Sequence, residues 1–381
     1  MTTRQANPLR LLAVLVPLLL GYAALVQTLK LAAAGGFVHA DFFGLWSFAR
    51  FAGMHGVASL YRQPAALAAF QQHLGLVGHY PYPYPPVALL WFWPLGGLGL
   101  NTARLIWTLL TAAACALAVA ALLGPGRGWR AFGILFVVLS PAAGLNLADG
   151  ETGYLIAALL LGGFALLPRT PIAAGILFGL LLFKPQFGWL LPFALAGLGA
   201  WRAFAIAALC GVGQVALSAL LFTPDSWHAW GLALSGYQAQ LTANGASLYR
   251  LMSTLDATAR TLGLGWSWAA QGLLMLAVAG LVWLMFHRTA YRLAVAAFCA
   301  LLPAACLHGF DYDMVFFAIA PLLAAESGLA PLWSPRTLLW LPAYIWPYVA
   351  GSGRVPWNLA AIFCLFYGLY LVRRGLTPSC A

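Results

Sequence analysis

Charged residues are scarce in this chain of 381 residues. They make up 7% of the sequence, and only eight of them are acidic, whereas about a quarter of the residues of a soluble domain are charged. Hydrophobic residues account for 63%, which is enough for on the order of a dozen membrane spans of about 20 residues each. The composition therefore excludes a soluble globular protein and predicts an all-α, polytopic membrane protein.

Cysteine is also rare, and its spacing excludes two common uses of that residue. The six cysteines fall singly, mostly inside apolar runs, without the pattern of a zinc site or a disulfide framework. We interpret them as small core residues. The net charge of +11 is attributed to cytoplasmic loops, because no basic and aromatic cluster resembles a nucleic-acid-binding module. No nucleic-acid partner is expected.

Apolar runs predict about 12 transmembrane helices in a single integral-membrane domain that covers residues 1–381. The first run resembles a signal peptide, but it is longer than the usual hydrophobic region of one, so we interpret it as a retained span. The predicted spans are 9–29, 103–123, 131–147, 153–168, 170–184, 186–201, 203–222, 265–286, 293–308, 312–328, 336–350 and 356–373.

The distribution of arginine predicts the orientation of these spans. With the N-terminus in the cytoplasm, arginines fall at every inner turn, as the positive-inside rule requires. This alternation holds only if Pro85–Leu100 forms a juxtamembrane helix and does not cross the membrane. Seven of the eight acidic residues then lie on the outer face: Asp41, Asp149, Glu151, Asp225, Asp256, Asp311 and Asp313. Their grouping indicates a site there, and the alternative is that they merely solvate the loops.

Two long segments, 30–102 and 223–264, are predicted to be outer loops that carry helices. In the first, 42–51 and 63–73 have polar positions at helical spacing within aromatic or apolar sequence. Such helices are expected to lie in the membrane interface, in contact with lipids.

Asp41 stands among aromatic residues at the start of the first outer segment. A carboxylate there is partly desolvated, which raises its pKa and makes it a better general base near neutral pH. The alternative is an N-cap for a helix that begins at Phe42. Position alone does not separate these two interpretations.

A proline-rich run follows, from Tyr80 to Pro86, in which tyrosine and proline alternate. Prolines at this density fix an extended, rigid path. The tyrosine rings are suited to stacking on a sugar or lining a lipid tail, and the alternative is a structural turn into the juxtamembrane helix.

Several separated motifs together resemble glycosyltransferase family 87, the bacterial polyprenol-phosphate-dependent glycosyltransferases of the GT-C superfamily. The resemblance covers most of residues 38–325. One departure is Gly150-Glu151, because many members of the family carry Gly-Gln there. The motifs are Asp41-Phe42, Gly56 with Leu60-Tyr61, Tyr84-Pro85-Pro86 leading to Pro94-Leu95, Trp107, Gly150-Glu151, Ala174-Gly175 through Gly179 to Lys184-Pro185, and His308-Gly309-Phe310-Asp311-Tyr312-Asp313.

The resemblance implies a multi-pass enzyme of the bacterial inner membrane whose site faces the periplasm. It implies an inverting transfer of a sugar, typically mannose, from a polyprenyl-phosphate donor to an acceptor hydroxyl on a glycolipid, a glycan or a protein. Asp41 matches the position of the family's usual base. No cofactor is implied.

The departing lipid phosphate needs cations to hold its charge. Lys184, one of only two lysines, and His308 lie at outer ends of predicted spans. An unpaired charge there is expensive, so Lys184 is either paired with an acid or poised to bind an anion, and His308 either binds phosphate when protonated or caps a turn. Among the other outer arginines, Arg62 and Arg250 are predicted to contact the phosphate, while Arg104 and Arg354 are further candidates that could instead snorkel to headgroups. The residues predicted to bind substrate are Tyr61, Tyr84, Glu151, Asp311 and Asp313.

Asp311 and Asp313 also raise the possibility of a metal site. No third ligand accompanies them at the spacing of a metal site. The family resemblance also implies a metal-independent enzyme, so no metal is expected. Two competing functions remain: a transporter or flippase of lipid-linked sugars, and a scaffold of an envelope-assembly complex. Internal repeats are typical of transporters, and none is seen here.

Overall fold

A computed structural model of the chain describes residues 40–243, 248–266, 268–329, 332, 339–351 and 355–377, together with Leu19, Ala23 and Val26. Within these residues the regular structure is helical, and extended segments pair only at the isolated antiparallel bridge between Met252 and Phe310. The all-α class is confirmed. The predicted first span, 9–29, lies outside the described residues apart from those three positions.

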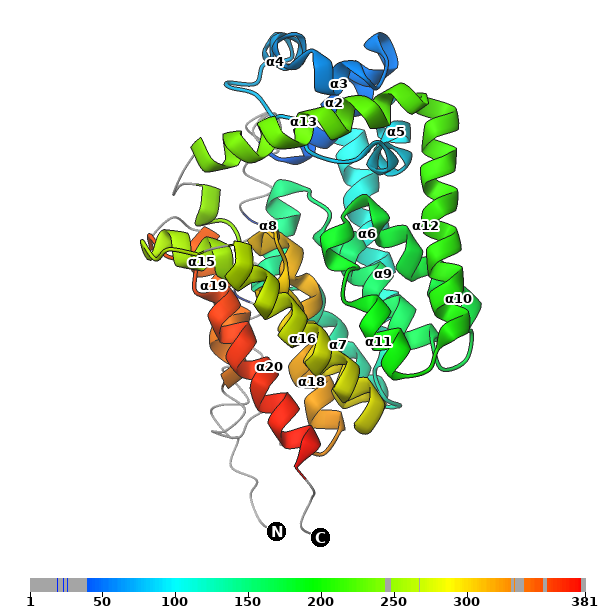
Figure 1. Cartoon of the computed structure of the whole chain (residues 1–381), viewed down its shortest axis with the longest axis vertical. Coiled ribbons are helices and arrows are strands. Elements are labelled where there is room, and N and C mark those ends of the chain that lie inside the picture. The colour runs from blue at the N-terminus through cyan, green and yellow to red at the C-terminus, as the bar shows by residue number, and fades with distance from the viewer. Residues whose placement is uncertain are drawn as a thin grey trace.

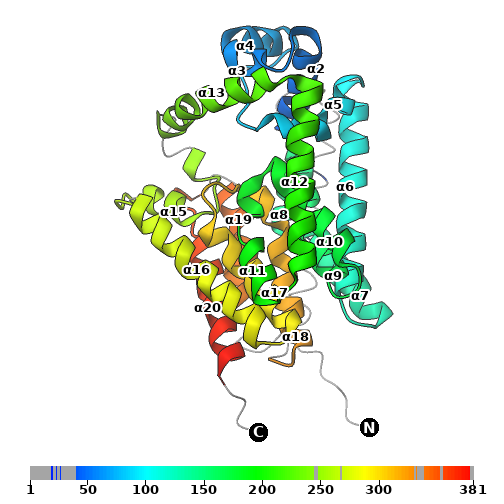
Figure 2. The same cartoon turned by 45° about the vertical axis from the view of Figure 1, so that its right-hand side comes forward.

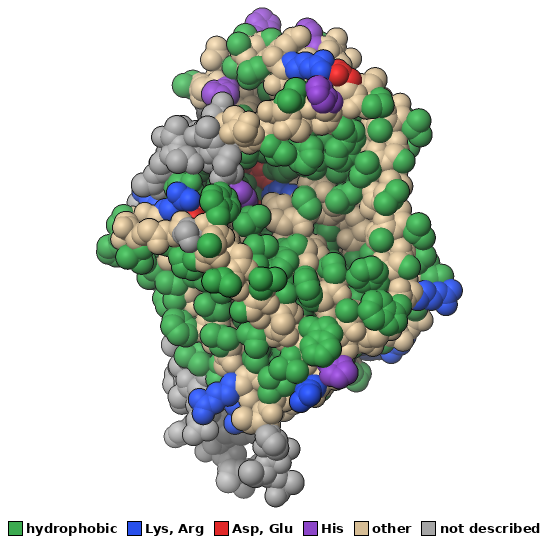
Figure 3. Space-filling model, viewed as in Figure 1, with side chains coloured by type: hydrophobic (Ala, Val, Ile, Leu, Met, Phe, Trp, Pro, Cys, Tyr) green, Lys and Arg blue, Asp and Glu red, His purple; other side chains and the backbone are tan. Residues whose placement is uncertain are grey.

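Three helices are long and apolar enough to cross a membrane: α6 (Leu100–Leu122), α12 (Trp201–Phe222) and α16 (Trp268–Arg288). Helices of this length extend for about 30 Å. Large apolar side chains are exposed on them, such as Leu220 of α12, which is 82% exposed. Hydrophobic residues also cover much of the side of the molecule in Figure 3. Such a surface favours contact with lipid tails, so the structure supports a membrane protein.

The predicted span 131–147 is a bent pair of helices. Helix α7 (Arg127–Val138) and helix α8 (Pro141–Asp149) meet at 54°. The break occurs because Pro141 cannot continue the hydrogen bonds of α7, while Ser140 caps the new helix by accepting a hydrogen bond from the Ala143 amide at 3.2 Å. Helix α8 ends at Gly150, whose backbone is in the left-handed conformation.

The other predicted spans form shorter helices, many of them buried in the centre of the bundle. Surrounding helices shield such elements, so they need not reach the full thickness of a bilayer. The predicted number of about 12 spans therefore stays a prediction. These elements are α9 (Gly153–Leu166), α10 (Pro171–Gly179), the 3₁₀ turns η3 (Leu180–Phe183) and η4 (Pro185–Phe187), α11 (Leu191–Gly197), α17 (Tyr291–Ala305), the 3₁₀ helix η5 (Asp311–Ala318), α18 (Ile319–Glu326), α19 (Trp340–Gly351) and α20 (Ala360–Leu376).

The first of the two predicted loop segments forms a cap at one end of the molecule (Figure 1). The first segment folds into α2 (Phe42–His55), α3 (Ser59–Arg62) and α4 (Pro64–His73). The proline-rich run then leads to η2 (Pro86–Ala88) and α5 (Leu89–Gly96), which are too short to cross a membrane. Helix α2 packs on α5, and α13 (Pro224–Ala243) lies across the molecule below the cap. Helix α15 (Leu255–Thr261) follows it.

The opposite end carries the last turns of α16 and α20 (Figure 2). Glu326, the one acidic residue predicted on this side, links three segments there. Its carboxylate accepts hydrogen bonds from the Gly124 amide at 2.7 Å and the Trp129 indole at 2.6 Å, and it pairs with Arg292. Glu326 therefore has a structural role in joining the α6–α7 turn to α17 and α18.

Candidate active site

A hollow below α13 exposes acidic and basic side chains inside a largely hydrophobic surface (Figure 3). Two adjoining cavities lie in this region. The first, called the acidic cavity, has a volume of about 510 Å³ and is lined by four carboxylates and four tyrosines. These residues are Asp41, Asp149, Glu151 and Asp311, with Tyr80, Tyr84, Tyr237 and Tyr312.

The second cavity, called the Lys184 cavity, has a volume of about 430 Å³ and combines cations with an apolar wall. Lys184 and His308 are its basic residues, and its apolar wall includes Trp189, Trp230 and Met275. The two cavities share four lining residues, so they adjoin one another: Pro83, Tyr84, Tyr237 and Phe310.

A third, almost wholly apolar groove of about 620 Å³ runs between α12 and the segment from α10 to α11. Gly211 lines the groove and leaves space beside it, because a Cβ there would meet only Leu182 at 3.8 Å. Gly179, which also lines the groove, lets α10 pack closely on α12, because a Cβ there would come within 2.6 Å of the Cys210 Cβ. The groove shares Pro185 and Trp189 with the Lys184 cavity. A continuous path therefore leads from the buried lysine to the apolar outside of the bundle.

Asp41 lies at the wall of the acidic cavity, immediately before α2. It occupies the N-cap position, but its side chain makes no capping hydrogen bond. Instead it forms a hydrogen bond with the Tyr80 side chain. Burial, and next the charge of Asp149, raise the pKa of Asp41 to about 7, while Tyr80 and Lys184 oppose that rise. The carboxylate is therefore available to a ligand and titrates near neutral pH.

The turn between α8 and α9 is held from α6. Arg104 Nη2 donates hydrogen bonds to the carbonyl oxygens of Leu147 at 3.0 Å and Ala148 at 2.6 Å. One turn later on α6, Trp107 Nε1 donates to the carbonyl oxygen of Glu151 at 3.2 Å. These contacts satisfy backbone groups at the end of α8 and fix the path of the chain that carries Asp149 and Glu151.

Gly150 lets this turn lie directly against α2. Its φ is +73°, and a Cβ atom there would come within 2.7 Å of the Phe42 Cβ. Both the left-handed backbone and the close approach require glycine. The turn thus brings Asp149 and Glu151 to the same cavity as Asp41.

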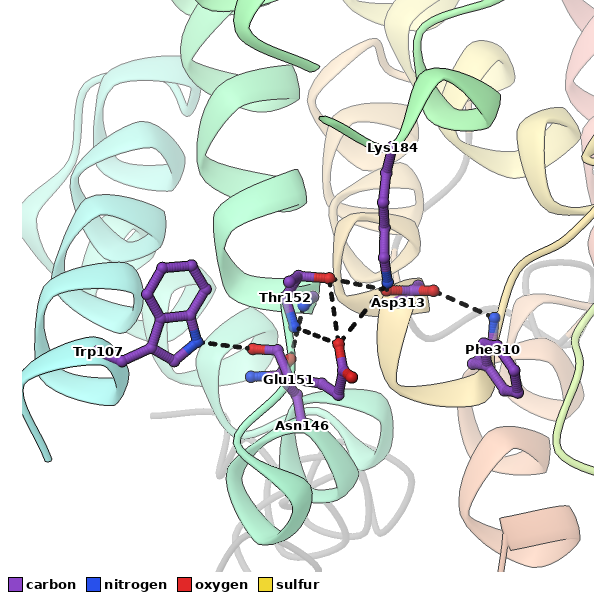
Figure 4. A network of polar contacts seen from close by, with 8 residues as sticks. Trp107, Asn146, Glu151, Thr152, Lys184, Phe310 and Asp313 are labelled. Atoms are coloured by element: carbon purple, nitrogen blue, oxygen red, sulfur yellow. Dashed lines mark hydrogen bonds and ion pairs between the residues drawn. The ribbon is translucent and has the colours of Figure 1, made fainter. Parts of the chain in front are cut away.

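Lys184 is at the centre of a buried polar network (Figure 4). Its Nζ lies 2.9 Å from Asp313 Oδ1 and 3.7 Å from Glu151 Oε2, and Lys184 is only 4% exposed. The backbone amides of Thr152 and Phe310 donate to Glu151 and Asp313, at 3.1 and 3.2 Å. The lysine also lies over the rings of Tyr84 and Tyr312, at 5.7 and 5.5 Å. Four predicted site residues are therefore brought together: Tyr84, Glu151, Lys184 and Asp313.

Burial raises the pKa of Glu151 to about 7, although the nearby charge of Lys184 opposes this rise. One lysine faces two buried carboxylates, and an unbalanced buried charge is costly. The network is therefore electrically balanced when Glu151 holds a proton.

Asp311 belongs to a separate cluster. Its Oδ1 accepts hydrogen bonds from the Ser253 hydroxyl and from Asn358 Nδ2, the latter at 2.8 Å. Its Oδ2 is buried and has no hydrogen-bond partner among the described residues. Because Asp311 lines the acidic cavity, this oxygen is available to form a hydrogen bond with a ligand there.

The remaining predicted residues differ in whether they line a cavity. Tyr84 lines both, whereas the Tyr61 hydroxyl donates to the Tyr84 carbonyl at 2.8 Å and so supports the proline-rich run from outside. Arg250 follows Leu248, which lines the acidic cavity, and its buried Nε has no partner among the described residues. Arg62 is not among the residues that line either cavity. It pairs with Asp225 through two contacts of 2.7 and 2.5 Å at the surface.

Sequence reasoning placed Asp149 on the outer face but did not assign it to the site. Its position one residue before the Gly150-Glu151 motif was the available signal. Asn358 and Ser253 carried no comparable signal, because their role depends on tertiary contact with Asp311. Arg354 lies outside the described residues.

Within the described part of the chain, no group of three or more His, Cys, Asp or Glu residues is placed to hold a metal ion. The absence of a metal requirement stays a prediction. The site has instead carboxylates suited to proton transfer and hydroxyl binding, next to cations suited to an anionic group.

A family model, glycosyltransferase family 87, matches residues 82–308, which is more than half of the chain. Neither the curated proteins nor the solved structures include a match. The matched range contains Tyr84, Glu151, Lys184 and His308, whereas Asp41 precedes it. The chain belongs to glycosyltransferase family 87.

Proposed function

We propose that this glycosyltransferase transfers a sugar, mannose by family resemblance, from a polyprenyl-phosphate donor to an acceptor hydroxyl, with inversion at the anomeric carbon. One observation carries this proposal: a cavity rich in carboxylates adjoins a cavity that joins a buried lysine to an apolar path. The first suits the acceptor and the base, and the second suits the phosphate and its lipid.

Asp41 is the proposed base. The acceptor hydroxyl must lose its proton as its oxygen attacks the anomeric carbon, and a carboxylate whose pKa is about 7 accepts a proton efficiently near neutral pH. In an inverting displacement the acceptor and the leaving phosphate occupy opposite sides of the reacting carbon. Two adjoining cavities, with Asp41 in one and Lys184 in the other, offer that separation.

Lys184 and His308 are the proposed phosphate-binding residues, with Arg250 nearby. Bound phosphate would add negative charge beside Lys184, and a protonated Glu151 would compensate for it. The phosphate would also favour the charged form of His308. We leave Arg62 out of this set because its guanidinium is already paired with Asp225 at the surface.

The apolar groove beside α12 is the proposed path of the polyprenyl chain. Its shared residues Pro185 and Trp189 place its upper end next to Lys184. An isoprenoid chain in such a groove stays within apolar surroundings while its phosphate reaches the buried cation. At the other side of the site, Asp311 Oδ2 is proposed to hydrogen-bond to a hydroxyl group. That hydroxyl belongs either to the donor sugar or to the molecule that receives the sugar, a glycolipid or glycan.

We propose that the site faces the periplasm of a bacterial inner membrane. The last turns of α16 and α20 carry Arg288, Arg373 and Arg374 at the end of the molecule away from the cap (Figure 1). Basic residues at that end favour a cytoplasmic position for it.

The test is transfer of radiolabelled mannose from polyprenyl phosphate mannose to membrane lipid extract by the purified protein. We expect Asp41→Asn to abolish transfer and to retain donor binding, because the amide keeps the shape of the side chain but cannot accept the proton. In the wild type, kcat/KM should fall as the pH is lowered through about 7, because protonation removes the base.

Asp225→Asn is the matched control, because it makes the same chemical change at a surface position. Normal turnover by Asp41→Asn would refute the assignment of the base. Donor binding without transfer, in wild type and variant alike, would point to another acceptor or to transport, and donor flipping in liposomes would distinguish these two.

A further inference from the structure

We infer that Asp149 is a positioning residue for the transfer reaction: a second carboxylate, anchored through Arg104, that keeps Asp41 able to accept a proton at neutral pH. This inference rests on the proposed role of Asp41 as the base. Its structural basis is the contact between the α8–α9 turn and the start of α2.

The two carboxylates lie in one cavity on segments that touch. Asp41 and Asp149 both line the acidic cavity. The residues that follow them, Phe42 and Gly150, approach so closely that a Cβ on Gly150 would come within 2.7 Å of the Phe42 Cβ. The contact between α2 and the α8–α9 turn therefore lies immediately beside both acids.

Arg104 limits the movement of Asp149. The arginine is 4% exposed, and its Nη2 donates to the backbone of the two residues that precede Asp149. These hydrogen bonds anchor the last turn of α8, where unsatisfied carbonyl oxygens would otherwise be buried. Burial, and next the charge of Glu151, raise the pKa of Asp149 to about 7, and the positive charge of the same guanidinium opposes that rise.

An ionised Asp149 disfavours ionisation of Asp41, because like charges repel strongly in a site shielded from water. After burial, the charge of Asp149 is the largest cause that raises the pKa of Asp41 to about 7. The two acids are therefore coupled: ionisation of either one disfavours ionisation of the other, and Arg104 favours the charge on Asp149.

Several other groups face this pair from neighbouring elements. Tyr80 hydrogen-bonds to Asp41, and Lys184 and Asp313 act on Asp41 from the buried network. Glu151 and Arg104 act on Asp149. Removal of the charge on Asp149 leaves the Lys184 contacts with Asp313 and Glu151 in place, so the substitution isolates the effect of one carboxylate.

The experiment is an infrared titration of protonated carboxyl groups in the purified full-length protein. The Asp41 band is identified by its loss in Asp41→Asn. We expect its midpoint to lie near pH 7 in the wild type. In Asp149→Asn we expect the midpoint, and with it the pKa of Asp41, to fall by about 1 unit. In Asp149→Glu, which keeps the charge, the midpoint should stay close to that of the wild type.

The acid limb of the kcat/KM profile should move in the same direction, to lower pH in Asp149→Asn. Asp225→Asn is the control and should shift neither quantity. Should Asp149→Asn fail to fold, Asp149→Ser also removes the charge and has a smaller side chain.

An unchanged Asp41 midpoint after loss of the Asp149 charge would overturn the inference, and a lower rate without a shift of the limb would reduce Asp149 to a purely structural role. The infrared measurement needs no donor or acceptor. A failure of the proposed transfer reaction and a failure of this inference are therefore separable.

Discussion

Lys184 is shared by two buried carboxylates, and this ratio of charges determines which protonation states the site can hold. Asp313 is the closer partner, at 2.9 Å against 3.7 Å for Glu151. The pKa of Glu151 is raised to about 7, mainly by burial. A protonated glutamate is neutral and presents one donor and one carbonyl acceptor, much as glutamine does, and glutamine is the residue that the family resemblance implies after this glycine. The apparent departure from the family motif is therefore chemically small.

This comparison predicts opposite outcomes for two matched substitutions. Glu151→Gln should keep kcat/KM within about tenfold of the wild type, because burial raises the pKa of Glu151 to about 7 and glutamine mimics the neutral form that this favours. Asp313→Asn should lower kcat/KM on the order of 100-fold, the equivalent of about 3 kcal/mol, because it removes the charged hydrogen-bond partner of a buried lysine.

Transfer assays and thermal unfolding of both purified variants test this prediction. Both substitutions change a carboxylate to an amide, so each variant controls for the other. A severe loss in Glu151→Gln would mean that the ionised glutamate is needed, contrary to our interpretation of the Gly150-Glu151 motif.

At the scale of elements, the sequence predicted helices best where one strong signal determined them. The start of α2 at Phe42 and the long apolar helices α6, α12 and α16 agree with the predicted ranges to within a few residues. Interruptions were harder to predict, because the run 131–147 is apolar on both sides of its break and only Pro141 signals the bend.

The candidate site, too, could be predicted from the sequence only in part. Its charged residues were visible because charge is rare in this chain, and Lys184 proved to lie with Glu151 and Asp313. The sequence could not show that Arg62 is paired at the surface or that Asn358 holds Asp311, because both facts depend on contacts between distant segments.

The apolar groove gives a prediction about α12. Gly211 lines the groove and has space beside it, since a Cβ there would meet only Leu182 at 3.8 Å. Gly211→Leu should narrow the groove and raise the KM for a long-chain donor about tenfold, with a smaller effect on a donor that has a short isoprenoid chain. Loss of apolar contacts worth about 1.4 kcal/mol is sufficient for that change.

Gly213→Leu is the control, because a Cβ at Gly213 meets nothing within 4 Å and this residue is not among those lining the groove. Both substitutions replace a helical glycine and should favour the helix similarly. Equal effects of Gly211→Leu on long-chain and short-chain donors would place the polyprenyl chain elsewhere.

The whole molecule has two chemically different ends, joined by α6 (Figure 2). One end holds the cap, α13 and the carboxylates of the site, whereas the other gathers basic helix ends around the structural Glu326. The Arg62–Asp225 pair links α3 to α13, but exposed pairs contribute only about 0–1 kcal/mol. The chemical difference between the ends therefore bears on orientation in the membrane more than on stability.

Orientation can be measured with single cysteines at the two ends. Val77, which follows α4 in the cap, is 87% exposed, and Gly128 at the start of α7 is exposed at the other end, with open space for a side chain. If the basic end is cytoplasmic, a membrane-impermeant maleimide added to intact spheroplasts should label Val77→Cys and spare Gly128→Cys. Membrane permeabilisation should expose Gly128→Cys to the reagent.

The native cysteines allow a simple background for this experiment. Cys115, Cys299, Cys306 and Cys364 are buried and can be retained. The substitutions Cys210→Ser and Cys380→Ser then give a background protein that does not react with the maleimide. Because α6 connects the two ends, its 23 residues must cross the bilayer if the labels lie on opposite sides. Labelling of Gly128→Cys in intact spheroplasts would reverse the orientation and move the carboxylates to the cytoplasmic side. Labelling of both positions there would mean that α6 does not cross, and the predicted alternation would then fail at its second span.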